Sequence, residues 1–146
     1  MKVRGNGPIP SRIMVVGEFP GEQEERSGEP FAGSAGQELG RMLSEVGILR
    51  SECYVTLVCK ARPRDNQLGE FVAATKSRIT AAHVQLRDKW VTKEIVEGYN
   101  ELLTEIEMVQ PNLIIAFGNL ALWALTGRWG VLKWRGSLLQ EKKTSA

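Results

Sequence analysis

Short runs of apolar residues indicate where strands are expected. Residues 13–16, 54–58 and 113–117 are each almost wholly apolar and only four or five residues long. Apolar runs of this length, without polar alternation, are typical of strands that are buried on both faces of a sheet. We therefore expect three such strands in the interior of the protein.

Apolar residues at helical spacing fill the intervals between these runs. Leu39, Leu43 and Val46 lie on one face of a helix predicted over residues 34–46, with Ser34 as its N-cap. Two further helices are expected, each closed by a proline or glycine. They cover residues 94–109 and 119–126.

The order of these elements predicts the fold class. Strands that alternate with helices indicate an α/β fold of three layers, α/β/α, around a central, mostly parallel sheet. Apolar pairs at residues 131–132 and 138–139 predict a further strand pair, so we expect a four-stranded sheet. A length of 146 residues fits a single domain over residues 1–146. Residues 71–90 fit a helical stripe in part, and we expect one helix there, within an insertion over residues 67–92.

Composition places the chain among soluble globular proteins, with 42% hydrophobic and 25% charged residues. Its longest apolar stretch, residues 113–125, is shorter than the ~20 residues that a membrane helix needs. The N-terminus lacks the continuous apolar core of a signal peptide, so we expect a cytoplasmic protein without membrane contact. The net charge of +2, from 19 bases and 17 acids, is too small to indicate a nucleic-acid partner by itself.

Candidate metal ligands are few. Cys53, Cys59 and the single histidine, His83, fall short of the usual four ligands of a structural zinc site. We therefore expect no metal, no disulfide framework, and a surface position for His83.

Three polar loops are candidates for the functional site, because ligands of open α/β sheets bind beyond the carboxyl ends of the strands. They read GEFPGEQEE from Gly17, GEPFAGSAG from Gly28, and KARPRDN from Lys60. Taken singly, each loop is also compatible with a structural role. The first could be a polar strand-to-helix turn, Phe31 a buried loop anchor, and Asn66 an ordinary turn residue.

The order of the loops along the chain is more specific than any one loop. The segments are GEFPGEQEE, GEPFAGSAGQEL, VCKARPRDN, NLIIAFGNLALWALTG and WRGS. This series resembles the uracil-DNA glycosylase superfamily, and most closely its family 4, over roughly residues 13–140. The resemblance implies a domain that takes uracil out of single- or double-stranded DNA and hydrolyses its N-glycosidic bond without a cofactor.

The resemblance also implies roles for individual residues. Glu18 corresponds to the carboxylate associated with hydrolysis at the sugar carbon, and Glu24 and Glu25 correspond to the acidic pair behind it. Phe31 would stack on the extruded base, and Asn66 would bind the uracil edge through its amide. The resemblance further implies that Gly17 and Phe19 contact the base. It also implies DNA contacts for six residues: Pro20, Gly21, Arg62, Arg64, Lys133 and Arg135.

Several positions depart from the pattern of the family. Phe19 stands where family 4 has Ala or Gly, so we expect a narrower pocket and weaker catalysis. Ala61 replaces a cysteine of the family's iron–sulfur cluster, and no N-terminal cysteine pair exists, so no cluster is expected and Cys53 and Cys59 would be small buried core residues. The family's His-Pro-Ser motif does not follow Arg135, so we expect either a shortened sequence or a homologue that has lost the chemistry.

Three hypotheses remain open at this point. The first is an active DNA N-glycosylase. The second is a catalytically weak or inactive homologue that binds DNA or protein as a replication, repair or phage accessory, with a protein partner on residues 67–92. The third is an unrelated α/β interaction domain.

Overall fold

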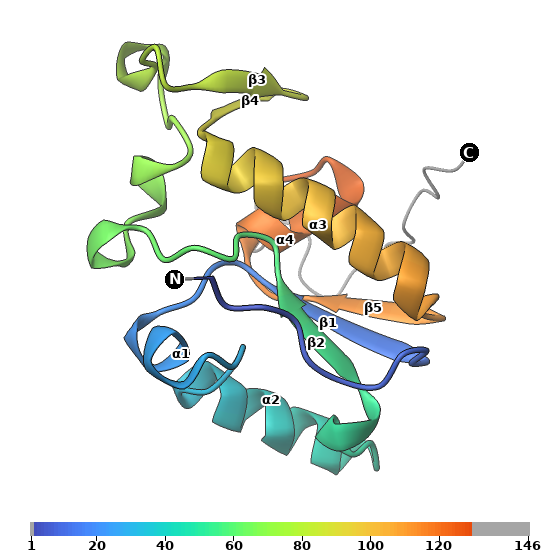
Figure 1. Cartoon of the computed structure of the whole chain (residues 1–146). Coiled ribbons are helices and arrows are strands. Elements are labelled where there is room, and N and C mark those ends of the chain that lie inside the picture. Colours follow the sequence, from blue (N-terminus) through green and yellow to red (C-terminus); the bar gives the residue numbers. More distant parts are fainter. Residues whose placement is uncertain (1, 130–146) are drawn as a thin grey trace.

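The computed structural model describes residues 2–129 of the chain. Its central sheet has three parallel strands in the order β2, β1, β5: β1 (Ile13–Gly17), β2 (Tyr54–Leu57) and β5 (Leu113–Ala116). Met14 of the middle strand lies opposite Tyr54 on one side and Ile114 on the other. The three strands predicted from the apolar runs are confirmed, and their carboxyl ends meet at one edge of the sheet (Figure 1).

Helices pack on both faces of this sheet (Figure 1). They are α1 (Glu22–Ser27), α2 (Ser34–Glu45), α3 (Lys93–Val109) and α4 (Asn119–Thr126). Val15 of β1 shares a buried cluster with Leu39 of α2, whereas Met14 and Val16 share another with Leu102 of α3 and with α4. Since neighbouring side chains of a strand point to opposite faces, β1 contributes to both clusters and the layers are α/β/α.

The helix boundaries follow from their caps. Gly33 occupies the N-cap position of α2, so the predicted cap at Ser34 is wrong by one residue. Gly127, with a φ of 78°, ends α4 where predicted. The short helix α1 was not predicted, because none of its residues is buried and apolar spacing cannot mark it. At its start, the Glu24 carboxylate accepts a hydrogen bond from the backbone N–H of the N-cap residue Gly21 at 2.9 Å. Among residues 2–129, no helix is both long enough and apolar enough to cross a membrane.

The helix predicted over residues 71–90 is wrong. The segment instead forms an antiparallel hairpin of β3 (Val84–Leu86) and β4 (Lys89–Val91). Residues 84–86 alternate apolar, polar, apolar, whereas Trp90 and Val91 are adjacent apolar residues, and Arg87, with a φ of 56°, lies in the tight turn. Short 3-10 helices occupy much of the remaining connections: Arg50–Glu52, Arg64–Asn66, Leu68–Glu70 and Lys76–Arg78.

Strand β5 is less buried than the sequence predicts. Leu113 is 46% exposed and the other three residues of the strand are half-buried, whereas all four residues of β2, at the other edge of the described sheet, are buried. The fourth strand expected from residues 131–132 and 138–139 lies outside the described residues. The structure thus establishes an α/β fold with a parallel sheet of three described strands and a separate antiparallel pair.

A buried polar network joins β2 to α3. The Lys60 ammonium donates to Glu105 Oε1 at 2.6 Å and to the carbonyl of Leu57 at 2.5 Å, and the Tyr54 hydroxyl donates to Glu105 Oε2 at 2.7 Å. Lys60, Glu105 and Tyr54 are all buried. Burial, and then the neighbouring Glu105, raise the pKa of Tyr54 above its usual range. The network therefore holds a charged pair whose members depend on one another inside the fold.

Candidate functional site

A cavity of about 250 Å³ opens at the carboxyl ends of the three parallel strands. Loops from adjacent strands meet here, as expected for a ligand site in an α/β sheet. Five residues predicted for the site line it: Gly17, Glu18, Phe19, Glu24 and Phe31. Four residues that the sequence analysis did not single out complete the wall: Ala35, Leu57, Phe117 and Gly118. The first two predicted loops are therefore brought together around one cavity.

The ring of Phe31 is fixed against the end of the sheet. Phe31 is 6% exposed, and its ring meets that of Phe117 edge-on, with centroids 5.7 Å apart and planes at 67°. The ring also packs on Gly17, where a Cβ atom would lie only 2.7 Å from Phe31 Cζ. Phe31 thus lines the cavity with an aromatic side chain whose orientation the fold determines.

The backbone of the Phe31 loop is held by Arg50. Its guanidinium donates to the carbonyls of Pro30 at 2.8 Å, Phe31 at 3.0 Å and Gly36 at 3.4 Å. Phe31 itself has a φ of 55°, a conformation that non-glycine residues rarely adopt. Sequence reasoning missed Arg50, because a single arginine after a helix carries no local signal of contacts to residues 14 to 20 positions earlier.

Glu18 leaves β1 and reaches the start of α4. Its Oε2 accepts a hydrogen bond from the backbone N–H of Leu120 at 2.9 Å. The carboxylate lies across Gly118, where a Cβ atom would be 2.3 Å from Glu18 Cδ and where φ is 93°. Oε1 has no hydrogen-bond partner within residues 2–129, so one carboxylate oxygen is fixed by the helix and the other can act in the cavity.

Glu24 organises the loops around the cavity. Its Oε1 accepts from the backbone N–H of Gly21 at 2.9 Å, and its Oε2 accepts from those of Ala32 at 3.0 Å and Gly33 at 2.8 Å. These three bonds tie the first loop to the Phe31 loop. The contacts favour a positioning role for Glu24, while its predicted catalytic role remains a prediction.

Asn66 is not among the residues that line the cavity. Its Oδ1 accepts from Arg62 Nε at 3.0 Å and lies 4.0 Å from the point where a Cβ atom on Gly21 would stand. Arg62 also pairs with Glu25 at 3.4 Å. The third loop is therefore next to the first, and binding of a base edge by Asn66 stays a prediction.

Besides Arg62, the residues predicted to contact DNA fall into three groups. Pro20 is buried, and Gly21 occupies the N-cap position of α1. Arg64 is exposed over 82% of its side chain and pairs with Glu70 at 3.7 Å. Lys133 and Arg135 lie outside the described residues.

The cysteines do not fit an iron–sulfur cluster. Cys53 belongs to the buried cluster under α2, and Cys59 to the cluster on the opposite face of the sheet. Burial raises the pKa of both thiols, that of Cys59 to about 11, and the Cys59 thiol donates to the carbonyl of Ala61 at 3.2 Å. A cluster requires several convergent thiolates, so these residues are core side chains, as the sequence predicts.

The geometry can now be compared with known proteins. The family model of the uracil DNA glycosylase superfamily matches residues 4–143. The chain belongs to this superfamily. The cavity with Glu18 and Phe31 lies within the region that the superfamily model covers.

Curated proteins similar to this superfamily member are of two kinds. It is 34% identical to the Type-4 uracil-DNA glycosylase of Thermotoga maritima over 120 residues, which is 82% of this chain and 52% of that protein. It is 35% identical to that of Archaeoglobus fulgidus over 120 residues, 82% of this chain and 49% of the relative. It is also 31% identical to a DNA polymerase of Bacillus phage SP01 over 139 residues, 94% of this chain but 13% of the polymerase. The chain thus spans about half the length of the glycosylases it matches.

Proposed function

We propose that the protein binds a uracil base flipped out of DNA and hydrolyses its N-glycosidic bond. The observation that carries this proposal is the cavity at the strand ends, which brings the Glu18 carboxylate and the Phe31 ring together in a member of the superfamily. A pocket of this kind holds an extruded base by stacking and edge hydrogen bonds. Its carboxylate would act on the attached sugar.

The chemistry follows from Glu18 Oε1, the carboxylate oxygen without a hydrogen-bond partner among residues 2–129. As the bond between the sugar C1′ and uracil N1 breaks, its electron pair leaves with the base and positive charge develops on the sugar. The carboxylate stabilises this charge and orients a water molecule, whose oxygen bonds to C1′ while its proton passes to the carboxylate and then to solvent. No cofactor takes part in this step.

Recognition of the base would combine Phe31 and Asn66. Phe31 offers an aromatic surface whose loop is held by Arg50 and Glu24. The Asn66 amide can present one donor and one acceptor to the uracil edge. For this, its oxygen would give up the hydrogen bond from Arg62 and accept one from the base. Arg62, Arg64, Lys133 and Arg135 would contact the phosphates.

A second candidate is a homologue that binds uracil-containing DNA with little or no turnover. Phe19, which lines the cavity, favours it, because a bulky ring leaves less room for the base than the small residue of family 4. The similarity to a phage DNA polymerase favours a role of this second candidate in DNA synthesis. We also retain as proposals a fourth strand and a cytoplasmic location. For the second candidate alone, residues 67–92 would bind a protein partner.

The deciding experiment measures binding and turnover separately on the 146-residue chain. Affinities for matched oligonucleotides with one uracil or one thymine give selectivity, and release of free uracil gives turnover. Release that Glu18→Gln abolishes supports the enzyme, and selective binding without release supports the second candidate. Glu52→Gln, a change at an exposed carboxylate outside the cavity, is the matched control. Equal affinity for both oligonucleotides without release contradicts both candidates.

A further inference from the structure

The hairpin segment, residues 71–92, carries the positive charge of the chain. Its charged residues are four bases and one acid: Lys76, Arg78, Arg87, Lys89 and Asp88. Its net charge is therefore +3, and since the whole chain carries +2, the remaining residues sum to −1. None of these charged residues lines the cavity, so the proposed chemistry does not account for them.

Trp90 lies on the outer face of the hairpin. The strands pair Gln85 with Trp90 and Leu86 with Lys89. Because side chains alternate along a strand, the fully buried Val91 and the half-buried Leu86 define the inner face, and Trp90 points the other way. Trp90 is 38% exposed, so a large aromatic surface is left accessible to a planar group.

The turn of the hairpin is fixed to the body of the protein. Arg87 donates to the carbonyl of Trp123 at 2.8 Å and to the Tyr99 hydroxyl at 2.5 Å, and its guanidinium lies 5.1 Å from the centre of the Tyr99 ring. Asp88 accepts from the Trp123 indole N–H at 2.7 Å. Arg87 and Asp88 therefore hold the hairpin in place.

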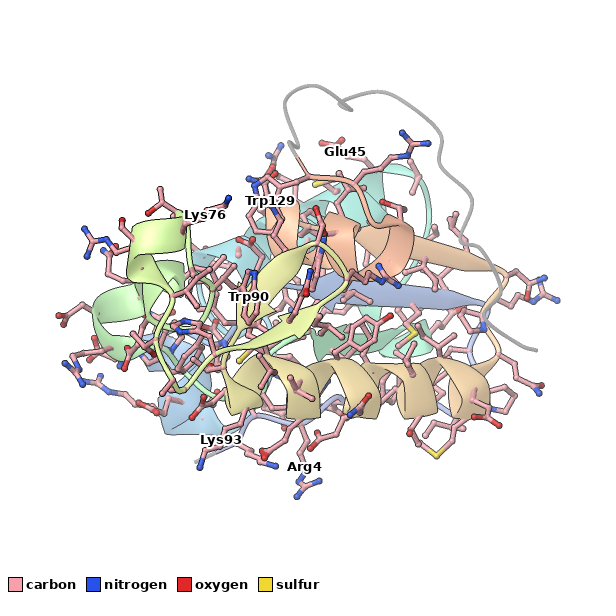
Figure 2. All side chains as sticks on the ribbon, turned by 90° about the horizontal axis from the view of Figure 1, so that it is seen from above. Arg4, Glu45, Lys76, Trp90, Lys93 and Trp129 are labelled. Carbon is pink, nitrogen blue, oxygen red and sulfur yellow. The ribbon has the colours of Figure 1, made fainter. Side chains whose placement is uncertain are left out.

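Two of the remaining bases, Lys76 and Arg78, are on the 3-10 helix before β3. The third, Lys89, pairs with Leu86 and so lies on the inner face of the hairpin, where its ammonium is 4.7 Å from the centre of the Trp129 ring. Within residues 2–129, none of the three forms an ion pair with an acidic side chain. Figure 2 shows Lys76, Trp90 and Trp129 on one side of α3, with Arg4 and Lys93 on the other.

We propose that the outer surface of the hairpin segment, made of Lys76, Arg78 and Trp90, binds single-stranded DNA. Bases would stack on the Trp90 indole and phosphates would pair with the cations, a combination typical of single-strand binding sites. Protein interfaces are depleted in lysine, so unpaired cations beside the indole favour a nucleic acid over a protein partner.

The proposal rests on the proposed function for the identity of the polymer. Figure 1 shows the hairpin beyond the amino-terminal end of α3, at the end of the sheet where the parallel strands have their carboxyl ends. A strand whose base enters the cavity can continue from this edge onto the hairpin. The hairpin surface would then bind the flanking nucleotides whatever their sequence.

Fluorescence anisotropy with a labelled, uracil-free single-stranded oligonucleotide tests the hairpin surface on the 146-residue chain. Trp90→Ala is expected to weaken binding about tenfold, while Trp90→Phe retains most of the affinity because a stacking ring remains. Lys76→Gln and Arg78→Gln should each lower the slope of log affinity against log salt by about 0.7. Arg4→Gln and Lys93→Gln, on the other side of α3, are matched charge controls and should leave the slope unchanged.

The outcomes separate the hairpin surface from the cavity. If Trp90→Ala binds like the parent and the hairpin cations behave like the controls, the hairpin proposal is overturned. Preference for uracil that persists in that case leaves the proposed function intact. If Trp90→Ala instead changes only self-association in sedimentation, the surface is a protein interface and the proposal again fails. A parent chain that binds no DNA overturns both.

Discussion

The carboxylate of Glu18 accepts a hydrogen bond from the backbone N–H of Leu120 at 2.9 Å, so the residue that follows β1 caps the helix that follows β5. One side chain therefore joins two strand ends and lines the cavity between them. A structural and a catalytic role for Glu18 coexist, and they respond differently to substitution.

Glu18→Gln should keep the cap and lose the charge. An amide oxygen can still accept from Leu120, so we expect the free energy of unfolding to fall by less than for Glu18→Ala, which should cost about 1 kcal/mol. Uracil release should fall at least about a hundredfold in both variants. Chemical unfolding and a release assay measure the two effects, and a Gln variant that turns over like the parent would contradict the catalytic role.

Glu24→Ala should destabilise the loops around the cavity. Three backbone N–H groups lose a charged acceptor, and we expect a loss of about 2 to 3 kcal/mol in the free energy of unfolding. Glu25→Ala, next in the chain, removes one partly exposed ion pair and should cost less than about 1 kcal/mol. Urea titrations of both variants test this, and equal losses would show that Glu24 does not organise the loops.

Gly17→Ala should displace the aromatic wall of the cavity. The added Cβ atom would lie 2.7 Å from Phe31 Cζ and 2.9 Å from Leu57 Cδ2, so we expect weaker uracil binding and a loss of stability of about 1 to 3 kcal/mol. Gly40→Ala is the control, because nothing lies within 4 Å of its Cβ position inside α2 and the change should stabilise the helix by about 1 kcal/mol. Thermal unfolding and binding assays on both variants give the comparison, and undiminished binding by Gly17→Ala would mean that the ring does not contact the base.

Removing one partner of the buried Lys60–Glu105 pair should be strongly destabilising. Lys60→Met leaves the Glu105 carboxylate buried without its cation, and we expect a loss of about 3 to 5 kcal/mol. The double variant Lys60→Met with Glu105→Leu should recover part of this loss, but not all, because the Tyr54 hydroxyl still lacks its acceptor. A double-mutant cycle by urea unfolding measures the coupling, and additive losses would contradict it.

Alkaline pH should destabilise the fold through Cys59. Burial raises the pKa of this thiol to about 11, above that of an exposed thiol, so the folded state holds the proton more tightly. The resulting stabilisation is complete below about pH 8.5 and is lost as the pH rises toward about 11. Tm measured against pH should therefore fall less steeply in Cys59→Ala than in the parent. Identical slopes would show that ionisation of Cys59 does not contribute.

The sequence predicts those parts of the fold that have a local period. Apolar runs mark all three parallel strands, the 3.6-residue spacing marks α2 and α3, and the flanking glycines Gly118 and Gly127 mark α4. The hairpin was missed because its strands are only three residues long and β4 places the apolar residues Trp90 and Val91 side by side, so that a partial helical stripe was the clearer pattern.

The residues of the candidate site were likewise predicted or missed according to whether a local sequence pattern marks them. Glu18 and Phe31 were identified because they lie in recognisable loops next to strand ends. Arg50 and Phe117 were missed because they act across the sheet or across a helix, on partners far away in the chain. Contacts of that kind depend on tertiary packing and have no pattern in the residues nearby.

The cavity begins where the two hydrophobic clusters meet, since Gly17 directly follows Val15 and Val16, which pack on opposite faces of the sheet. Substitutions at these strand residues, made to change the preferred base by laboratory evolution, would therefore lower the stability of the fold. Ala35 is different, because it is exposed in the first turn of α2 and still lines the cavity. A library randomised at this residue would vary the shape offered to a base while leaving both clusters untouched.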